Sequence, residues 1–189
     1  MKFENAKLLL SKYVKGETLL RHSLTVAVVM EYFAKELGEA NPEFWKSAGF
    51  VHDIDFELYP GEHCVKAKEI LESEKQNFPE ITDEIIHAVL SHGYKVANSV
   101  EPVSQMEKVL YAIDELTGLV FACTMVRPSK SVNDLEAKSV IKKFKTPAFA
   151  ANCNREIISN GARMLGIDLN ALIEKTILAM RAHSAELGV

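Results

Sequence analysis

Apolar residues recur at helical spacing along nearly the whole chain, and this periodicity constrains the fold more than any other feature. Apolar and polar residues never alternate over a stretch long enough to indicate a strand. The pattern predicts helices over residues 4–14, 17–38, 42–52, 62–75, 80–92, 103–125, 133–145, 149–166 and 169–187. We therefore expect an all-α protein, folded as a compact helical bundle without a sheet.

Residues that favour helix ends support these boundaries. Pro42 stands at a first-turn position, where its missing N–H costs nothing. Gly166 can end one helix, and Asp168 can cap the next. Asn133 followed by Glu136 resembles a capping box, with Asn in place of Ser or Thr.

The chain has 189 residues, which suits one domain over 1–189 with a core of about 17–125 and a helical C-terminal extension of about 126–189. Its net charge of −4 does not favour broad binding to nucleic acid or to a membrane surface. No apolar stretch is long enough for a membrane span, and the charged first residues do not suit a signal peptide. The oligomeric state stays open.

The three cysteines, Cys64, Cys123 and Cys153, are far apart in the sequence and lack C-x-x-C spacing. This spacing favours neither a disulfide framework nor a zinc ribbon. Reduced thiols in a cytoplasmic protein are the simple interpretation.

One histidine lies on an apolar helix face. His22 precedes Val26, Val29 and Phe33 by four, seven and eleven residues, so that all four share one side of a helix. The side chain of His22 is therefore expected to point toward the core. Taken alone, such a histidine is more often a hydrogen-bonded core residue than a ligand.

Two aspartates stand in comparable places. Asp114 follows Leu110 by four residues in an apolar stripe, and the pair His52-Asp53 ends a helix whose buried side includes Val51. A buried carboxylate needs a partner, because leaving it unpaired costs several kcal/mol. A structural salt bridge is the plain alternative, but one divalent ion could satisfy all these groups. Imidazole and carboxylate ligands suit Fe, Mn, Zn, Co or Ni better than Mg.

The order His … His-Asp … Asp, carried by LLRHSLTVAVVM, FVHDIDFE and LYAIDELTG, resembles the motif of the HD superfamily of phosphohydrolases. The resemblance implies that His22, His52, Asp53 and Asp114 hold a divalent metal ion. It implies hydrolysis of a phosphate ester or phosphoanhydride by metal-activated water, with His52 and Asp53 as catalytic residues. The expected substrate is a nucleotide or a related small phosphorylated metabolite.

His63 and His92 resemble the extra histidine ligands of two-metal members of the superfamily. In that case Asp53 would bridge two ions; the alternative is a solvent-facing histidine at each helix end. His87 lies about 140° around the helix from His92 and is interpreted as structural or exposed. His183 is interpreted as neither ligand nor catalyst.

The motif also departs from the resembled family. Many relatives read His-Asp-Ile-Gly-Lys, whereas this chain continues after His52-Asp53 with Ile-Asp-Phe and lacks the lysine. Asp55 and Glu57 are additional acids that could orient water, bind a second cation or lie in solvent. For Glu57 the solvated loop position is the favoured interpretation.

A basic segment follows the predicted helix that contains Asp114. Arg127 and Lys130 are the better candidates in it for contacts to a substrate phosphate, since arginine offers a fork and lysine a point charge. A solvated surface is the alternative. Three rival functions also stay open: a di-iron oxygenase of HD type, a non-catalytic domain with a structural metal, and nucleic-acid binding, which the acidity disfavours.

Overall fold

The computed structural model describes all 189 residues and contains ten α-helices, two short 3-10 helices and no β-strand. The prediction of an all-α protein is confirmed. The chain divides into two compact units, Met1–Tyr111 and Ala112–Val189, and the boundary falls within helix α6. The expectation of a single domain over 1–189 stays a prediction. None of the helices combines the length and the apolar character needed to cross a membrane.

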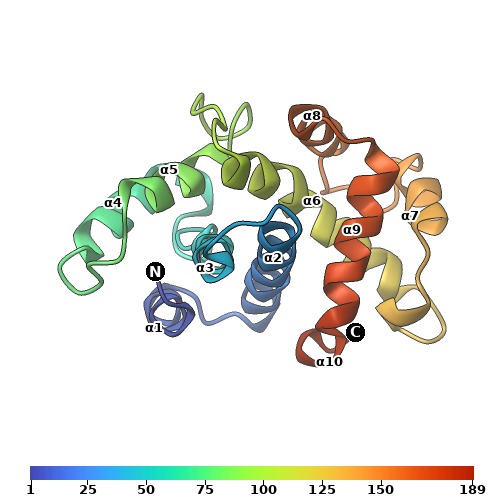
Figure 1. Ribbon diagram of the computed structural model, residues 1–189, viewed down its shortest axis with the longest axis horizontal. Helices are drawn as coiled ribbons and strands as arrows, with labels where there is room; N and C mark the ends of the chain where they lie inside the picture. Colours follow the sequence, from blue (N-terminus) through green and yellow to red (C-terminus); the bar gives the residue numbers. More distant parts are fainter. The chain divides into compact units, whose positions relative to one another are not determined.

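The first unit is built from helices that pack mainly on α3. Its elements are α1 (Phe3–Tyr13), α2 (Glu17–Glu36), α3 (Pro42–Val51), the 3-10 helix η1 (Pro60–Glu62), α4 (Val65–Glu74), α5 (Asp83–Ser91) and the start of α6 (Gln105–Met125). Helix α3 packs against α1, α2 and α5, and α4 packs against α5 (Figure 1). Helix α3 therefore ends in the interior of this unit.

Apolar side chains from three elements fill the core around that end. Leu9 and Leu10 of α1, Val51 and Ile54 at the end of α3, and Leu71 of α4 are all fully buried. Each buried side chain of this size stabilises the fold by about 1.5–3 kcal/mol. Because residues 51 and 54 are anchored in this way, the two residues between them are held inside the unit as well.

Polar side chains fix where the helices of this unit begin. The Asn41 side chain accepts a hydrogen bond from the Phe44 N–H at 3.2 Å, and Pro42 occupies the first turn of α3 as predicted. The carboxylate of Glu57 accepts hydrogen bonds from the N–H groups of Lys15 and Gly16, which precede α2. These caps satisfy backbone donors that have no partner inside a helix.

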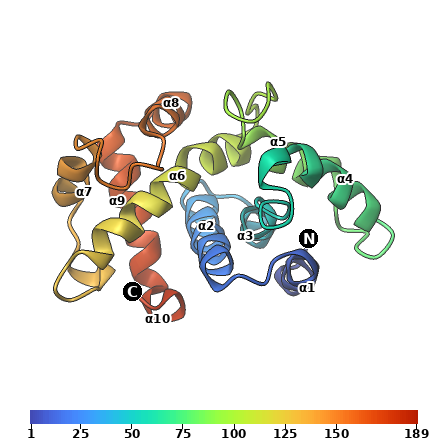
Figure 2. The same cartoon turned by 180° about the vertical axis from the view of Figure 1, so that it is seen from behind.

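The second unit is organised around α9. It contains the rest of α6, the 3-10 helix η2 (Val132–Asp134), α7 (Ala137–Phe144), α8 (Arg155–Leu165), α9 (Leu169–Ala182) and α10 (Ser184–Leu187). Helix α9 packs against α7 and α8. Figure 2 shows these helices from the back of the view in Figure 1. A Cβ at Gly161 of α8 would lie 2.4 Å from the Cα of Ala112, so glycine permits the close approach of α8 to α6.

Helix boundaries in the second unit correct several expectations. Gly166 is left-handed and the Asp168 side chain accepts from the Ala171 N–H at 3.0 Å, which confirms both predicted end signals. The predicted capping box is wrong: Asn133 lies in η2, and Glu136 makes no capping hydrogen bond to α7. The helix predicted over 133–145 is therefore a 3-10 turn followed by α7.

The helix predicted over 149–166 begins only at Arg155. The guanidinium of Arg155 donates to the carbonyl groups of Phe149, Ala150 and Cys153, and thereby holds the preceding residues in turns. The helix predicted over 169–187 is interrupted at His183, which separates α9 from α10.

Candidate metal centre

Four histidines and one aspartate of the first unit meet at the buried end of α3. His22 comes from α2, His52 and Asp53 follow α3 directly, His63 follows η1, and His92 is the C-terminal cap of α5. His52 and His92 are buried, and Asp53 is 8% exposed. His22 and His63 keep 27% and 19% of their side chains exposed, so the cluster remains accessible from outside.

The Asp53 carboxylate lies at the centre of the cluster. Its Oδ2 lies 3.6 Å from His22 Nε2 and 3.3 Å from His52 Nε2. Its Oδ1 lies 3.4 Å from His63 Nε2 and 3.6 Å from His92 Nε2. Each carboxylate oxygen therefore faces two imidazole rings, and each ring presents its Nε2 atom to that oxygen.

The other ring nitrogen of two histidines is already committed to the backbone. His52 Nδ1 lies 2.7 Å from the carbonyl oxygen of Gly49, and His92 Nδ1 contacts the carbonyl oxygen of Val89. A carbonyl oxygen only accepts, so each Nδ1 must donate. In the neutral imidazole the Nε2 atom then carries a lone pair, which is the form that binds a metal.

His63 is oriented by Asp55. Its Nδ1 donates to Asp55 Oδ1 at 2.8 Å, while Asp55 Oδ2 accepts from the Ala67 N–H at 2.8 Å. Burial lowers the pKa of His63, but the hydrogen bonds to Asp55 and Cys64, together with the charge of Asp53, raise it to about 9. Asp55 is fully buried, and its two hydrogen bonds connect the cluster to the first turn of α4.

The arrangement requires positive charge between the imidazoles and the carboxylate. Burial raises the pKa of Asp53, but the positive charge of His52 and hydrogen bonds from His52 and His92 lower it well below its usual range. Asp53 is therefore ionised. Lone pairs on neutral Nε2 atoms would repel this carboxylate, so protons or metal ions must lie between them.

The distances between the donor atoms suit a metal ion. A tetrahedral ion with bonds of about 2.0–2.2 Å to nitrogen and oxygen separates neighbouring donors by about 3.3–3.6 Å. The four distances from Asp53 to the histidines fall between 3.3 and 3.6 Å. His52, Asp53 and His92 also form a group of potential ligands within 4.8 Å of one another. The residues present therefore fit a divalent ion.

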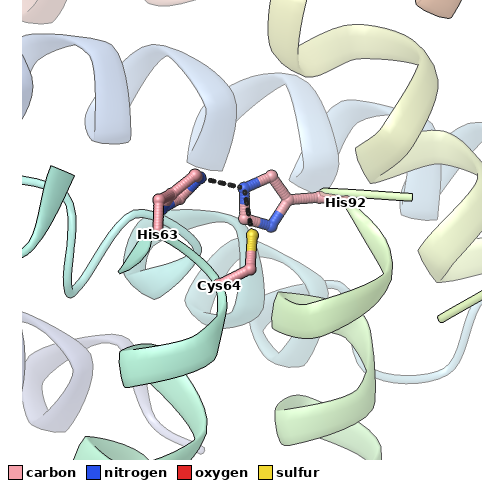
Figure 3. A group of neighbouring side chains, drawn as sticks. All are labelled: His63, Cys64 and His92. Atoms are coloured by element: carbon pink, nitrogen blue, oxygen red, sulfur yellow. Dashed lines mark hydrogen bonds between the residues drawn. The ribbon is translucent and has the colours of Figure 1, made fainter. Parts of the chain in front are cut away.

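The sequence interpretation missed Cys64. Its thiol is buried, and its Sγ lies 3.7 Å from His92 Nε2 (Figure 3). His63, Cys64 and His92 form a second group of potential ligands. Cys64 directly follows His63, so the dipeptide of two potential ligands is the signal in the sequence that could have identified it.

Three further residues were singled out by the sequence. Glu57 caps the segment before α2, which gives it a structural role, and His87 Nδ1 pairs with Glu107 Oε1 at 3.0 Å. Asp114 lies on α6 three residues beyond Tyr111, in the second unit, and its role as a ligand stays a prediction.

The two predicted phosphate contacts belong to the second unit. Arg127 directs Nε and Nη2 to the two carboxylate oxygens of Asp134, both at 2.9 Å. Lys130 is exposed and has a positive φ of 48°. A phosphate at Arg127 would therefore compete with an existing bidentate ion pair.

Comparison with known proteins identifies the family of this chain. The HD domain family matches residues 19–119. The chain is 31% identical over 156 residues to a ribonuclease Y of Thermosipho melanesiensis, and 26% identical over 162 residues to one of Streptococcus sanguinis. These alignments cover 75% and 84% of this chain but 27% of each relative. No solved structure matches. The matched segment contains more than half of the chain, which therefore belongs to the HD family of metal-dependent phosphohydrolases.

Proposed function

We propose that the protein hydrolyses a phosphate ester or phosphoanhydride with a divalent ion held at Asp53. One observation carries the proposal: three imidazoles direct their Nε2 atoms to the buried carboxylate of Asp53. The Nδ1 atom of each of these rings donates to another acceptor of the protein. A structural salt bridge would not need a converging set of lone pairs. An ion of Fe, Mn, Zn, Co or Ni is the expected occupant.

The cluster divides into two positions. His22 and His52 would hold an ion on the Oδ2 side of Asp53, and His63 and His92 would hold one on the Oδ1 side. When bound, a divalent ion lowers the pKa of its water from 15.7 toward about 7 and polarises a phosphoryl oxygen. Asp114 keeps its predicted role as a further carboxylate ligand.

The protein itself supplies binding and orientation. The carbonyl of Gly49 fixes the ring of His52, and Asp55 fixes the ring of His63, so neither ring reorganises when a substrate arrives. Asp53 can accept a hydrogen bond from the attacking water and orient it. Partial exposure of His22 and His63 gives a phosphate group access from that side.

The phosphate contacts proposed for Arg127 and Lys130 have a separate test. Charge reversal in Arg127→Glu should raise KM more than it lowers kcat, because it removes uniform binding rather than stabilisation of the transition state. Steady-state kinetics would measure both constants. An unchanged KM in a folded variant would leave Arg127 as a structural partner of Asp134.

RNA is the second candidate substrate. Both relatives named above are ribonucleases, and this bears against the expectation that nucleic acid is disfavoured as a partner. A phosphodiester bond in RNA is compatible with the same chemistry. The acidic net charge of −4 favours a small phosphorylated metabolite instead.

The experiment is a substrate screen with metal-loaded protein. Phosphomonoesters, nucleotides, cyclic nucleotides and single-stranded RNA would be offered to wild type, to His92→Ala and to His87→Ala. The two variants change one histidine each near α5, but only His92 faces Asp53. We expect hydrolysis of at least one of these substrates, which His92→Ala should weaken and His87→Ala should preserve. Loaded protein inactive on every phosphate would contradict the proposal, and oxygen consumption with iron-dependent redox spectra would favour the di-iron rival.

A further inference from the structure

Cys64 places a sulfur atom beside the Oδ1 position of the centre. Figure 3 shows His63, Cys64 and His92 directed toward one another, from the segment before α4 and from the end of α5. The Nε2 atoms of His63 and His92 are 3.1 Å apart, and Cys64 Sγ lies 3.7 Å from His92 Nε2. The potential ligand atoms of all three residues lie within 4.8 Å of one another.

These distances match the edges of a tetrahedral site. Bonds of about 2.0–2.1 Å to nitrogen and about 2.3 Å to sulfur separate two nitrogens by about 3.3 Å and nitrogen from sulfur by about 3.6 Å. The observed separations are 3.1 and 3.7 Å. With Asp53 Oδ1 at 3.4 and 3.6 Å from the same nitrogens, the sulfur would be a fourth protein donor.

The backbone holds the sulfur in this place at an energetic cost. Cys64 has a φ of +66°, a left-handed conformation that residues with a side chain rarely adopt. A Cβ at Gly93 would lie 2.5 Å from Cys64 Sγ, so the glycine leaves the space that the sulfur occupies. Strained conformations of this kind persist mainly where the surrounding structure imposes them, often at functional sites.

We propose that Cys64 is a thiolate ligand on the Oδ1 side of Asp53 and selects a thiophilic ion there. This inference rests on the proposed metal centre. On binding, the S–H bond breaks, the proton passes to solvent, and the sulfur lone pair forms a bond to the ion. A ligand set of thiolate, two imidazoles and carboxylate favours zinc, cobalt(II) or iron(II) over manganese and magnesium.

Cobalt(II) is a direct probe, because sulfur bound to cobalt gives a charge-transfer band in the near ultraviolet that nitrogen and oxygen ligands do not give. Metal-free full-length protein would be reconstituted with cobalt(II) chloride, and its absorption spectrum recorded. Wild type should have the band, Cys64→Ser should lose it, and Cys153→Ser should keep it. Cys64→Gly removes the sulfur while accepting the positive φ, which guards against misfolding of the serine variant.

Ion preference gives an independent measurement. Loss of a partner of a metal ligand costs about 10–100-fold in affinity, so loss of a ligand should weaken zinc binding at least about tenfold. Manganese binding should change less, because manganese gains little from sulfur. Competition titrations of wild type and Cys64→Ser would measure both affinities.

The outcomes separate this inference from the proposed function. A wild-type protein that binds cobalt with visible ligand-field bands but no sulfur band would overturn the role of Cys64 and leave the metal centre intact. The same conclusion follows if Cys64→Ser has the spectrum and zinc affinity of wild type. A folded wild-type protein that binds no cobalt at all would overturn both proposals.

Discussion

Asp53 and Glu74 are two buried carboxylates of the same unit with opposite kinds of partner. Glu74 is 5% exposed and accepts hydrogen bonds from Tyr13 Oη at 2.7 Å, from Asn77 Nδ2 at 2.9 Å and from Lys12 Nζ. Burial raises the pKa of Glu74, but the hydrogen bonds from Lys12, Asn77 and Tyr13 lower it to about 2. Its charge is fully compensated by groups that keep their protons at neutral pH.

Asp53 is buried to a similar extent, but its oxygens face the Nε2 atoms of four histidines. Three of these rings donate through Nδ1 to other acceptors, and the fourth, His22, is partly exposed. Both carboxylates have a lowered pKa, so burial and a lowered pKa do not by themselves identify a functional site. The difference lies in the kind of partner: Glu74 is surrounded by a lysine, a tyrosine and an amide, whereas Asp53 is surrounded by imidazoles, which can exchange a proton for a metal ion. Glu74 is complete as it stands, whereas in the proposed function a metal ion completes the surroundings of Asp53.

Neutralising Asp53 should have the largest effect. Asp53→Asn removes the shared ligand of both positions, so activity should fall by more than about 100-fold, because loss of even a partner of a ligand costs 10–100-fold. Bound metal should fall in parallel, as measured by mass spectrometry of the protein. Glu74→Gln is the matched control and should retain its metal; equal loss in both variants would erase the distinction between the two carboxylates.

Removing one histidine from each side should separate the two positions. His52→Ala should empty the Oδ2 side, and His63→Ala the Oδ1 side, each lowering the number of ions bound by a two-metal protein from about two to one. Equilibrium titration with zinc, followed by metal analysis, would give these numbers. If the two variants bind as much metal as wild type, the assignment of two positions to Asp53 is wrong.

Asp55→Asn should have a smaller effect. The amide can still accept from the Ala67 N–H, but it no longer presents a charged acceptor to His63 Nδ1. We expect zinc affinity on the Oδ1 side to fall by about tenfold, with the Oδ2 side nearly unchanged. A loss of helicity in circular dichroism would instead indicate that Asp55 serves mainly to start α4.

Protonation or replacement of Glu74 should lower the stability of the fold and leave the reaction unchanged. Its folded pKa of about 2 lies below the ordinary value of 4.5, so its stabilisation is present above about pH 4.5 and is lost as pH falls toward 2. Because the Lys12 side chain is partly exposed, solvent screening should keep the loss below the roughly 3 kcal/mol that corresponds to the full shift. Denaturant unfolding at pH 7 and pH 3 would measure it, and in Glu74→Gln the pH dependence should shrink by a comparable amount.

Helical periodicity predicted the fold and the part of the centre that lies on helices. His22 and the pair His52-Asp53 stand on or beside apolar stripes, so their inward direction follows from residue spacing. The Oδ1 side depends on the path of residues 55–64, where η1 and a left-handed Cys64 replace regular helix. Such a path is set by tertiary contacts, and the structuring role of Asp55 could not be read from spacing.

The same reason explains the misplaced helix start before Arg155. The apolar pattern permits a helix from residue 149, but the guanidinium of Arg155 binds the carbonyl groups that this helix would use. Long-range and side-chain hydrogen bonds of this kind leave no periodic signal in the sequence.

The central claim is that Asp53 is completed by metal ions, and anomalous diffraction from crystals grown with zinc tests it most directly. The account predicts one peak beside Asp53 Oδ2, next to His22 and His52, and a second beside Oδ1, next to His63 and His92. Well-ordered crystals in which these side chains keep their places, with no anomalous peak near Asp53 at saturating zinc, would contradict it.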